Sequence, residues 1–222
     1  MNKYPMQDEA AIQEIYRRID ETAEEQNWER TSLSYYENQP YKALIAGMLS
    51  AQTREENTTE ASEALFALAD TPEAMARLTE AQIAVAIRPV RYWESKVRYV
   101  QDIAQKVAAN GGKVPQTVEE LMDYKGVGWK VAVLTLAVGY GIYDNITVDV
   151  HVARIGMRLG LFDPEIKQPP KINEALKQVL PRELWPYWNG LMVRFGRAIC
   201  LPRYPRCPIC PVNDLCPKIG VR

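Results

Sequence analysis

Four cysteines lie together in the segment CLPRYPRCPICPVNDLC, and the chain has no others. Cys200, Cys207, Cys210 and Cys216 give the spacing C-x6-C-x2-C-x5-C, with only one close pair. Clustered thiols in a reducing compartment favour metal ligation over disulfides. Zinc sites usually show two close pairs, whereas these longer loops suit four thiolates around a [4Fe–4S] cluster. The spacing therefore favours an iron–sulfur cluster and leaves zinc as the alternative.

A second candidate is Lys130, which ends the stretch KGVGWK, residues 125–130. Glycines two residues apart allow positive φ and expose backbone N–H groups. The joint and the start of the following helix could thus seat a phosphate, although such joints are more often simple tight turns. A partly buried lysine beside the positive end of a helix dipole loses basicity, which leaves free amine able to attack an electrophilic carbon. The ordinary alternative for a lone lysine is a solvated surface cation.

Asp149 stands just before the amphipathic run VHVARIGMRLG and is expected to cap that helix by accepting backbone N–H bonds. Capping would hold the carboxylate ionised and fixed in direction, which suits a group that stabilises a sugar cation or moves protons. The single histidine, His151, falls in the first turn of the same helix, and a structural role is favoured for it. Arg203 and Arg206 lie between the first two cysteines, where a bound cluster would hold them ready to grip phosphates.

The elements that must position these residues are helical. Apolar residues recur at helical spacing, and no segment alternates with period two for long. Thr117 and Glu120 give a capping-box pattern ahead of a short helix, and the breaks fall at prolines and glycines. We expect an all-α fold of roughly ten helices. The predicted helices cover residues 9–26, 41–53, 55–69, 73–77, 79–88, 93–109, 118–124, 129–139, 149–160, 171–180 and 183–199.

The 222 residues carry a net charge of −1, which is unusual for a protein that binds a polyanion. The charge is unevenly distributed: residues 1–80 hold 7 basic and 16 acidic side chains, and residues 81–222 hold 20 and 12. Any polyanion is expected to meet the second part, although ordinary solvated surface also explains such a gradient. No segment reads as a signal peptide or as a membrane span, so we expect a soluble, cytoplasmic protein.

Together these motifs resemble endonuclease III and its relatives, the helix-hairpin-helix DNA glycosylases with a C-terminal [4Fe–4S] cluster. The resemblance rests on LIAGMLSAQT, GVGWKVA, VDVHVAR and the cysteine loop, in that family's order and close to its spacing. It implies a six-helix barrel at 33–141, with the helix-hairpin-helix at about 117–139. It also implies a cluster domain formed by 1–32 and 142–222, with the cysteine loop at 200–216, and it places the iron–sulfur cluster well ahead of zinc.

The resemblance implies a base-excision-repair glycosylase and abasic-site lyase. Such a protein would act as a monomer, in the nucleoid-associated cytoplasm, on duplex DNA containing oxidised pyrimidines or abasic sites. Lys130 would be the nucleophile, and Asp149 would face it across a cleft. Gln52 would enter the gap left by the flipped nucleotide. The further DNA contacts are expected at Tyr92, Lys125, Gly126, Val127, Gly128, Arg203 and Arg206.

The chain departs from this family's pattern beside the DNA. The family commonly has Leu-Pro before the hairpin glycines, where this chain has Tyr124-Lys125, and the lysine is expected to add a phosphate contact. Arg91 replaces a usual glycine, and Tyr92 stands where a leucine wedge is often found. An aromatic wedge can stack on an exposed base, so the lesion or opposite base that the protein selects can differ from that of the family. The alternatives are a glycosylase for alkylated or mismatched bases, and a catalytically weak damaged-DNA-binding protein on the same scaffold.

Overall fold

The computed structural model describes residues 7–30 and 32–221, and the regular structure within them is helical, without strands. This confirms the all-α prediction, and the helix ends lie within three residues of those expected. None of the helices in these two ranges combines the length and apolarity that crossing a membrane requires. The elements are α1 (Glu9–Glu25), η1 (Ser32–Tyr36), α2 (Pro40–Ser50), α3 (Glu55–Leu68), α4 (Pro72–Met75), α5 (Glu80–Ile87), α6 (Trp93–Ala109), α7 (Val118–Met122), α8 (Trp129–Tyr140), α9 (Val150–Arg158), α10 (Pro169–Val179), η2 (Arg182–Leu184), α11 (Trp185–Ala198) and η3 (Cys207–Ile209).

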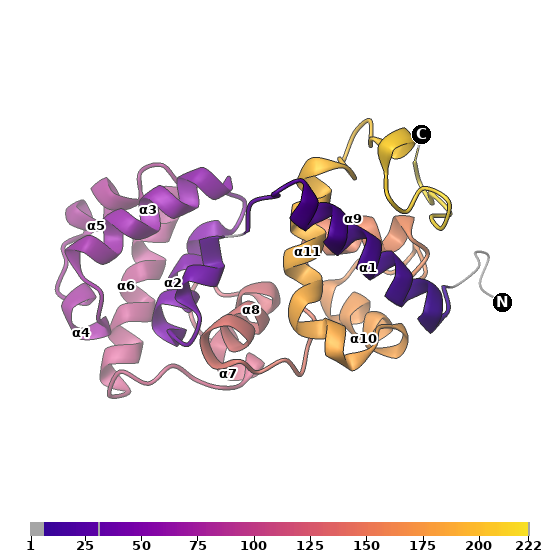
Figure 1. The fold of residues 1–222 in the computed structure, drawn as a ribbon. Coiled ribbons are helices and arrows are strands. Elements are labelled where there is room, and N and C mark those ends of the chain that lie inside the picture. The colour runs from indigo at the N-terminus through magenta and orange to yellow at the C-terminus, as the bar shows by residue number, and fades with distance from the viewer. Residues whose placement is uncertain (1–6, 31, 222) are drawn as a thin grey trace. The chain divides into compact units, whose positions relative to one another are not determined.

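The chain forms two compact units (Figure 1). Unit 1 comprises Met1–Thr31 and Tyr143–Arg222, and unit 2 comprises Ser32–Ile142. The boundaries expected from the sequence differ from these by one residue at each crossing. Residues 1–6, 31 and 222, which the expected domain ranges include, lie outside the described residues. Segments from both ends of the sequence therefore belong to one unit, and the stretch between them forms the other.

Unit 2 is built around α2 and α8, which pack against each other. Both helices are apolar on nearly every side, and 8 of the 11 residues of α2 are buried, as expected for interior helices. Gly139 permits the close approach, because a Cβ at this position would lie 2.5 Å from the Cα of Pro40. Each fully buried aliphatic side chain stabilises such a core by roughly 1.5–3 kcal/mol. The C-terminal end of α2 leads into Gln52, and the N-terminal end of α8 carries Lys130, so this helix pair positions both residues.

Unit 1 joins α1 to the C-terminal helices, and α1 crosses α11 in Figure 1. Tyr16 of α1 stacks on Trp188 of α11, with ring centroids 6.2 Å apart. Arg18 of α1 forms an ion pair with Asp214, in the cysteine loop, at 3.0 Å. One face of α1 buries the apolar residues that recur at helical spacing: Ile12, Ile15, Ile19 and Ala23. The N-terminal helix is thus part of the unit that holds the cysteines.

Candidate active site and cysteine centre

The glycine joint between α7 and α8 uses only one of its glycines for an unusual backbone conformation. Gly126 has φ +79°, and a Cβ there would lie 2.4 Å from the Tyr99 ring, so a larger residue does not fit. Gly128 has φ −95°, and a Cβ there would meet nothing within 4 Å. The expectation that both glycines provide positive φ is therefore wrong for Gly128. Gly128 is the N-cap of α8, and with no side chain to accept a bond from the first N–H groups it leaves open space before the helix.

The other residues of the joint differ in what they can offer a ligand. Val127 is buried, and its N–H donates to the Tyr124 carbonyl at 3.1 Å, which closes a tight turn. Lys125 is exposed, and its ammonium lies 3.7 Å from the Asp102 carboxylate. A phosphate at this joint would accordingly meet the Lys125 side chain and the backbone of the glycines and of α8.

Lys130 lies in the first turn of α8 and is half-buried. Its Nζ donates to the Ser50 hydroxyl at 3.4 Å, a long hydrogen bond. Ser50 in turn donates to the Gly47 carbonyl at 2.8 Å, at the end of α2. The α2–α8 pair therefore holds the amine beside the residues that lead into Gln52. The sequence predicts no role for Ser50, because nothing in it places this residue beside Lys130.

Two exposed residues expected to probe DNA occupy strained turns in unit 2. Gln52 has φ +56° and Tyr92 has φ +58°, and neither is a glycine. For a residue other than glycine, the left-handed backbone conformation costs roughly 1–3 kcal/mol and persists only where surrounding contacts hold it. Tyr92 is the N-cap of α6, is 50% exposed and has the Arg91 guanidinium 4.8 Å from its ring centroid. Such strain indicates that other contacts fix both turns.

Lys96 of α6 provides those contacts. Its ammonium donates to the carbonyls of Leu49 and Ala51 at 2.7 and 2.8 Å, and to the Thr53 hydroxyl at 3.1 Å. The same hydroxyl accepts the Arg91 N–H at 3.3 Å, so one brace links the Gln52 turn to the Tyr92 turn. Burial lowers the pKa of Lys96 from 10.5 to about 8. Sequence reasoning gave this lysine no function.

Asp149 is the N-cap of α9, as predicted. One carboxylate oxygen accepts the N–H groups of His151 and Val152, both at 2.9 Å. His151 Nδ1 lies 3.2 Å from Arg154 Nη2, and a guanidinium can only donate, so Nδ1 accepts and the ring proton is on Nε2. This contact agrees with a structural role for His151. Asp149 belongs to unit 1, whereas Lys130 belongs to unit 2.

The four cysteines line one cavity of unit 1. Within 7–30 and 32–221, no three His, Cys, Asp or Glu side chains stand close enough together to bind a single metal ion. Four cysteines that line one cavity supply the donor set of a [4Fe–4S] cluster, which is held by four thiolates. Burial raises the pKa of Cys210 to about 11 and also raises the pKa of Cys216. Ligation would therefore displace protons from these thiols.

Helix α9 connects the cysteine centre to Asp149. Arg158, which is 5% exposed, donates to Cys200 Sγ at 3.2 Å and to the Leu201 carbonyl at 2.7 Å. Arg154 donates to the Cys200 carbonyl at 3.0 Å. A buried cation beside a thiolate is favourable, and these arginines would offset the negative charge of a thiolate-ligated cluster. The helix capped by Asp149 thus also grips the first cysteine.

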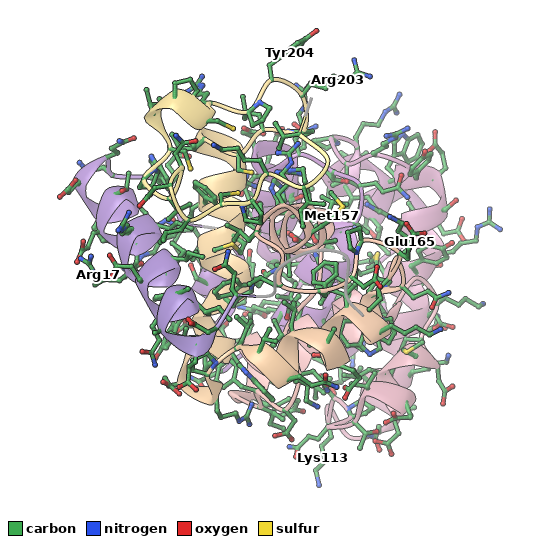
Figure 2. The ribbon with its side chains drawn as sticks, turned by 90° about the vertical axis from the view of Figure 1, so that its right-hand side faces the viewer. Arg17, Lys113, Met157, Glu165, Arg203 and Tyr204 are labelled. Atoms are coloured by element: carbon green, nitrogen blue, oxygen red, sulfur yellow. The ribbon has the colours of Figure 1, made fainter. Side chains whose placement is uncertain are left out.

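The loop between the first two cysteines presents basic and aromatic side chains to solvent. Arg203 and Arg206 are exposed, and Figure 2 shows Arg203 and Tyr204 projecting outward from this loop. Tyr204 is 87% exposed and has φ +52°. Sequence reasoning missed Tyr204, although an aromatic residue beside an arginine in a pinned loop is a usable signal for contact with nucleic acid. The loop can therefore offer both charge and a stacking surface.

Comparison with known proteins connects these features to one family. Residues 45–182 match the HhH-GPD superfamily base excision DNA repair protein family. The chain is 39% identical over 178 residues to endonuclease III-like protein 1 of Bos taurus, covering 80% of this chain and 58% of that protein. It is 38% identical over 184 residues to endonuclease III of Thermotoga maritima, covering 82% and 85%. The chain spans only about three-fifths of the length of its vertebrate relatives.

A solved structure extends the similarity to three dimensions. The chain resembles the protein in a trapped endonuclease III–DNA covalent intermediate, with a TM-score of 0.79 and 29% identity. The match covers 93% of this chain and 95% of that one, so both units have counterparts there.

Proposed function

We propose that this chain, which belongs to the HhH-GPD superfamily of base excision DNA repair proteins, is a DNA glycosylase of the endonuclease III type that also cleaves abasic sites as a lyase. The observation that carries the proposal is the position and partial burial of Lys130. This half-buried amine lies in the first turn of α8, directly after the joint 125–128, which we propose as a phosphate site. We propose that the protein works as a monomer on the DNA of the nucleoid, with oxidised pyrimidines as its lesions.

Lys130 is the proposed nucleophile. The damaged nucleotide must first leave the base stack, because its C1′ is inaccessible within the duplex. The neutral amine forms a bond to C1′ while the bond from C1′ to the base breaks, and the base leaves with that electron pair and gains a proton. Opening of the sugar ring gives a Schiff base, whose C2′ proton is acidic. Loss of that proton expels the 3′ phosphate oxygen and cuts the strand.

Asp149 is proposed to act on the same sugar. As the base departs, positive charge develops at C1′, and a fixed carboxylate stabilises it and can accept a proton. The two backbone N–H bonds at 2.9 Å fix the direction of this carboxylate. The cap and the chemical role therefore use the same feature of α9.

The proposed DNA contacts divide between both units. In unit 2, the joint 125–128 and the start of α8 bind a backbone phosphate, while Gln52 fills the gap in the duplex and Tyr92 stacks on an exposed base. In unit 1, the cysteine loop adds Arg203 and Arg206. The phosphate contacts orient the protein on the duplex, whereas Gln52 and Tyr92 are proposed to recognise the damaged position.

The cysteine centre is proposed to hold a [4Fe–4S] cluster through Cys200, Cys207, Cys210 and Cys216. When bound, the cluster supplies cross-links between chain segments that otherwise have few buried contacts. The loop that carries Arg203 and Arg206 is then ordered before DNA arrives, so binding costs less conformational entropy.

Borohydride trapping on an abasic duplex tests the proposal, because reduction converts the Schiff base into a stable covalent adduct. The wild-type protein should form the adduct, and Lys130→Gln should form none while still binding DNA. Lys125→Gln is the matched control, since it loses the same charge nearby but keeps the nucleophile. Tight binding to damaged duplex without any wild-type adduct would replace the enzyme with a damage-binding protein.

A panel of lesions separates the substrates. Duplexes containing thymine glycol, an alkylated purine or a thymine–guanine mismatch are incubated with the protein, and base release is measured in single turnovers. Release from thymine glycol alone supports the oxidised-pyrimidine proposal. Faster release from either of the other two duplexes would assign a different lesion to the same chemistry.

A further inference from the structure

We propose that Asp102 is a positioning residue that holds the joint 125–128 in the conformation that binds a DNA phosphate, so that this acidic side chain strengthens DNA binding. The inference rests on the proposed function for its ligand. It concerns a carboxylate of α6 that no step of the proposed chemistry uses. It also explains how the joint is fixed without the proline that the resembling family commonly places at position 125.

The Asp102 carboxylate is bonded directly to the backbone of the joint. One of its oxygens accepts the Lys125 N–H at 3.0 Å. The ammonium of Lys106 lies 3.1 Å from the same oxygen, and that of Lys125 lies 3.7 Å from the other. Lys106 also donates to the Asp123 carbonyl at 3.0 Å, just before the joint. The side chain of Asp102 is only 12% exposed, so these contacts occupy most of its surroundings.

A second contact from α6 fixes the same segment. Gly126 sits against the Tyr99 ring so closely that a Cβ would approach it to 2.4 Å. Tyr99 and Asp102 are three residues apart on a helix, so they share one face of α6. On that face, the Tyr99 ring packs against Gly126, and the Asp102 carboxylate accepts the N–H of Lys125, the first residue of the joint. Both interactions are local to unit 2.

The identity of residue 125 makes this arrangement possible. Proline has a fixed φ but carries no N–H, so it could not donate to Asp102. Lysine leaves φ unrestrained and supplies the donor. In this chain the hydrogen bond from the Lys125 N–H to Asp102 therefore restrains the backbone that a proline ring would otherwise restrain. The effect of each residue on the joint requires the other.

Electrostatics alone makes the opposite prediction, which allows a clear test. A carboxylate beside a phosphate site repels the ligand, so its removal should strengthen binding. Burial opposes ionisation of Asp102, but the Lys125 N–H and the Lys106 ammonium outweigh it and lower the pKa of Asp102. The group is therefore negatively charged at neutral pH. Weaker binding on loss of Asp102 would therefore contradict simple repulsion, and a positioning role predicts it.

The experiment measures the dissociation constant of the full chain for a duplex with a tetrahydrofuran abasic analogue, by fluorescence anisotropy. Asp102→Ala should weaken binding about tenfold, the usual effect of losing one charge-assisted hydrogen bond. Asp102→Asn keeps an acceptor oxygen and should stay within about threefold of wild type. Asp123→Ala is the matched control: it removes a neighbouring charge but keeps its carbonyl, so affinity should hold or rise. Binding by Asp102→Ala as tight as wild type would overturn the proposal.

A double-mutant comparison isolates the hydrogen bond. In a Lys125→Ala background the N–H of residue 125 remains, so Asp102→Ala should still weaken DNA binding more than Asp102→Asn does. In a Lys125→Pro background the donor is absent, so both changes at Asp102 should leave affinity unaltered. An equal loss in the two backgrounds would show that Asp102 acts through general stability. Should Asp102→Ala fail to fold, Asp102→Leu removes the acceptor oxygens at a similar side-chain volume, and its effect in the two Lys125 backgrounds decides the question.

Catalysis provides the readout that separates the two proposals. Trapping rates at saturating DNA should be unchanged in Asp102→Ala, because Lys130 and its surroundings are intact, so only the DNA concentration at half-saturation should rise. A slower rate at saturation would contradict a purely positioning role. If the wild-type chain traps nothing, the proposed chemistry fails, while the affinity series on the abasic analogue still tests Asp102 by itself.

Discussion

Asp149 combines a structural and a chemical role, and substitutions can separate them. Asn retains an oxygen that caps α9, whereas Ala does not. We expect Asp149→Asn to preserve the free energy of unfolding within about 0.5 kcal/mol, and Asp149→Ala to lose about 1 kcal/mol. Both should slow trapping on an abasic duplex by about a hundredfold or more, since both remove the charge. Denaturant unfolding and single-turnover kinetics measure the two effects, and full activity in Asp149→Asn would show that only the cap matters.

The two glycines of the joint should respond differently to a single methyl group. Gly126→Ala places a Cβ against Tyr99 at φ +79°, and we expect it to cost roughly 1–3 kcal/mol of stability and most of the DNA affinity. Gly128→Ala meets open space and should leave stability unchanged, yet weaken DNA binding by crowding the first N–H groups of α8. Thermal melting and anisotropy on one duplex provide the comparison. Equal melting temperatures for the two variants would contradict the assigned geometry.

At the scale of elements, α6 organises the parts of unit 2 that are proposed to meet DNA. Its N-cap is Tyr92, its first turns hold the Gln52 turn through Lys96, and its middle supports the joint through Tyr99 and Asp102. These positions recur every three or four residues, so they form one stripe along the helix. A single rigid element therefore sets the spacing of three binding segments.

The buried Lys96 predicts a pH dependence of stability. Its pKa falls from 10.5 in the unfolded chain to about 8 in the fold, so between these values the unfolded chain binds more protons. The free energy of unfolding should therefore rise with pH from about 8 to about 10.5 and level off below pH 8. Lys96→Met lacks this titration and leaves carbonyls unpaired, at a cost of about 1–3 kcal/mol. Denaturant titrations of both proteins from pH 7 to 10 should show the difference between them changing only above pH 8.

The helices could be predicted from the sequence, because amphipathic spacing and capping residues are local signals. The Asp149 cap and the central apolar helices follow from the same kind of signal. The Lys96 brace could not, since its bonds join residues 43 to 47 positions apart and its lysine resembles any surface cation in the sequence. The left-handed turns at Gln52 and Tyr92 were equally hidden, because non-glycine residues adopt that conformation only when tertiary contacts impose it.

At the scale of the whole molecule, the chain leaves unit 1, forms unit 2 and returns. Unit 1 is closed by contacts between distant segments, such as Gln7 Nε2 donating to the Leu215 carbonyl at 2.9 Å and Arg18 pairing with Asp214. No periodicity in the sequence indicates these partners. The same contacts tie α1 to the cysteine loop, so order in that loop and order in α1 should change together.

Loss of the cluster should therefore affect one unit and spare the other. Unit 2 has a core of its own around α2 and α8, whereas the cysteine cavity is lined by residues of α9, α11 and the loop. We expect Cys210→Ala to lack the visible absorption of an iron–sulfur cluster. Amide exchange should be at least about tenfold faster in α1, α9 and residues 199–221, and unchanged in 40–140. Wild-type protein stripped of iron is the control and should match the variant. Equal acceleration in both units, or bound zinc in a colourless and stable wild-type protein, would refute this account, because each requires something other than an iron–sulfur cluster to order unit 1.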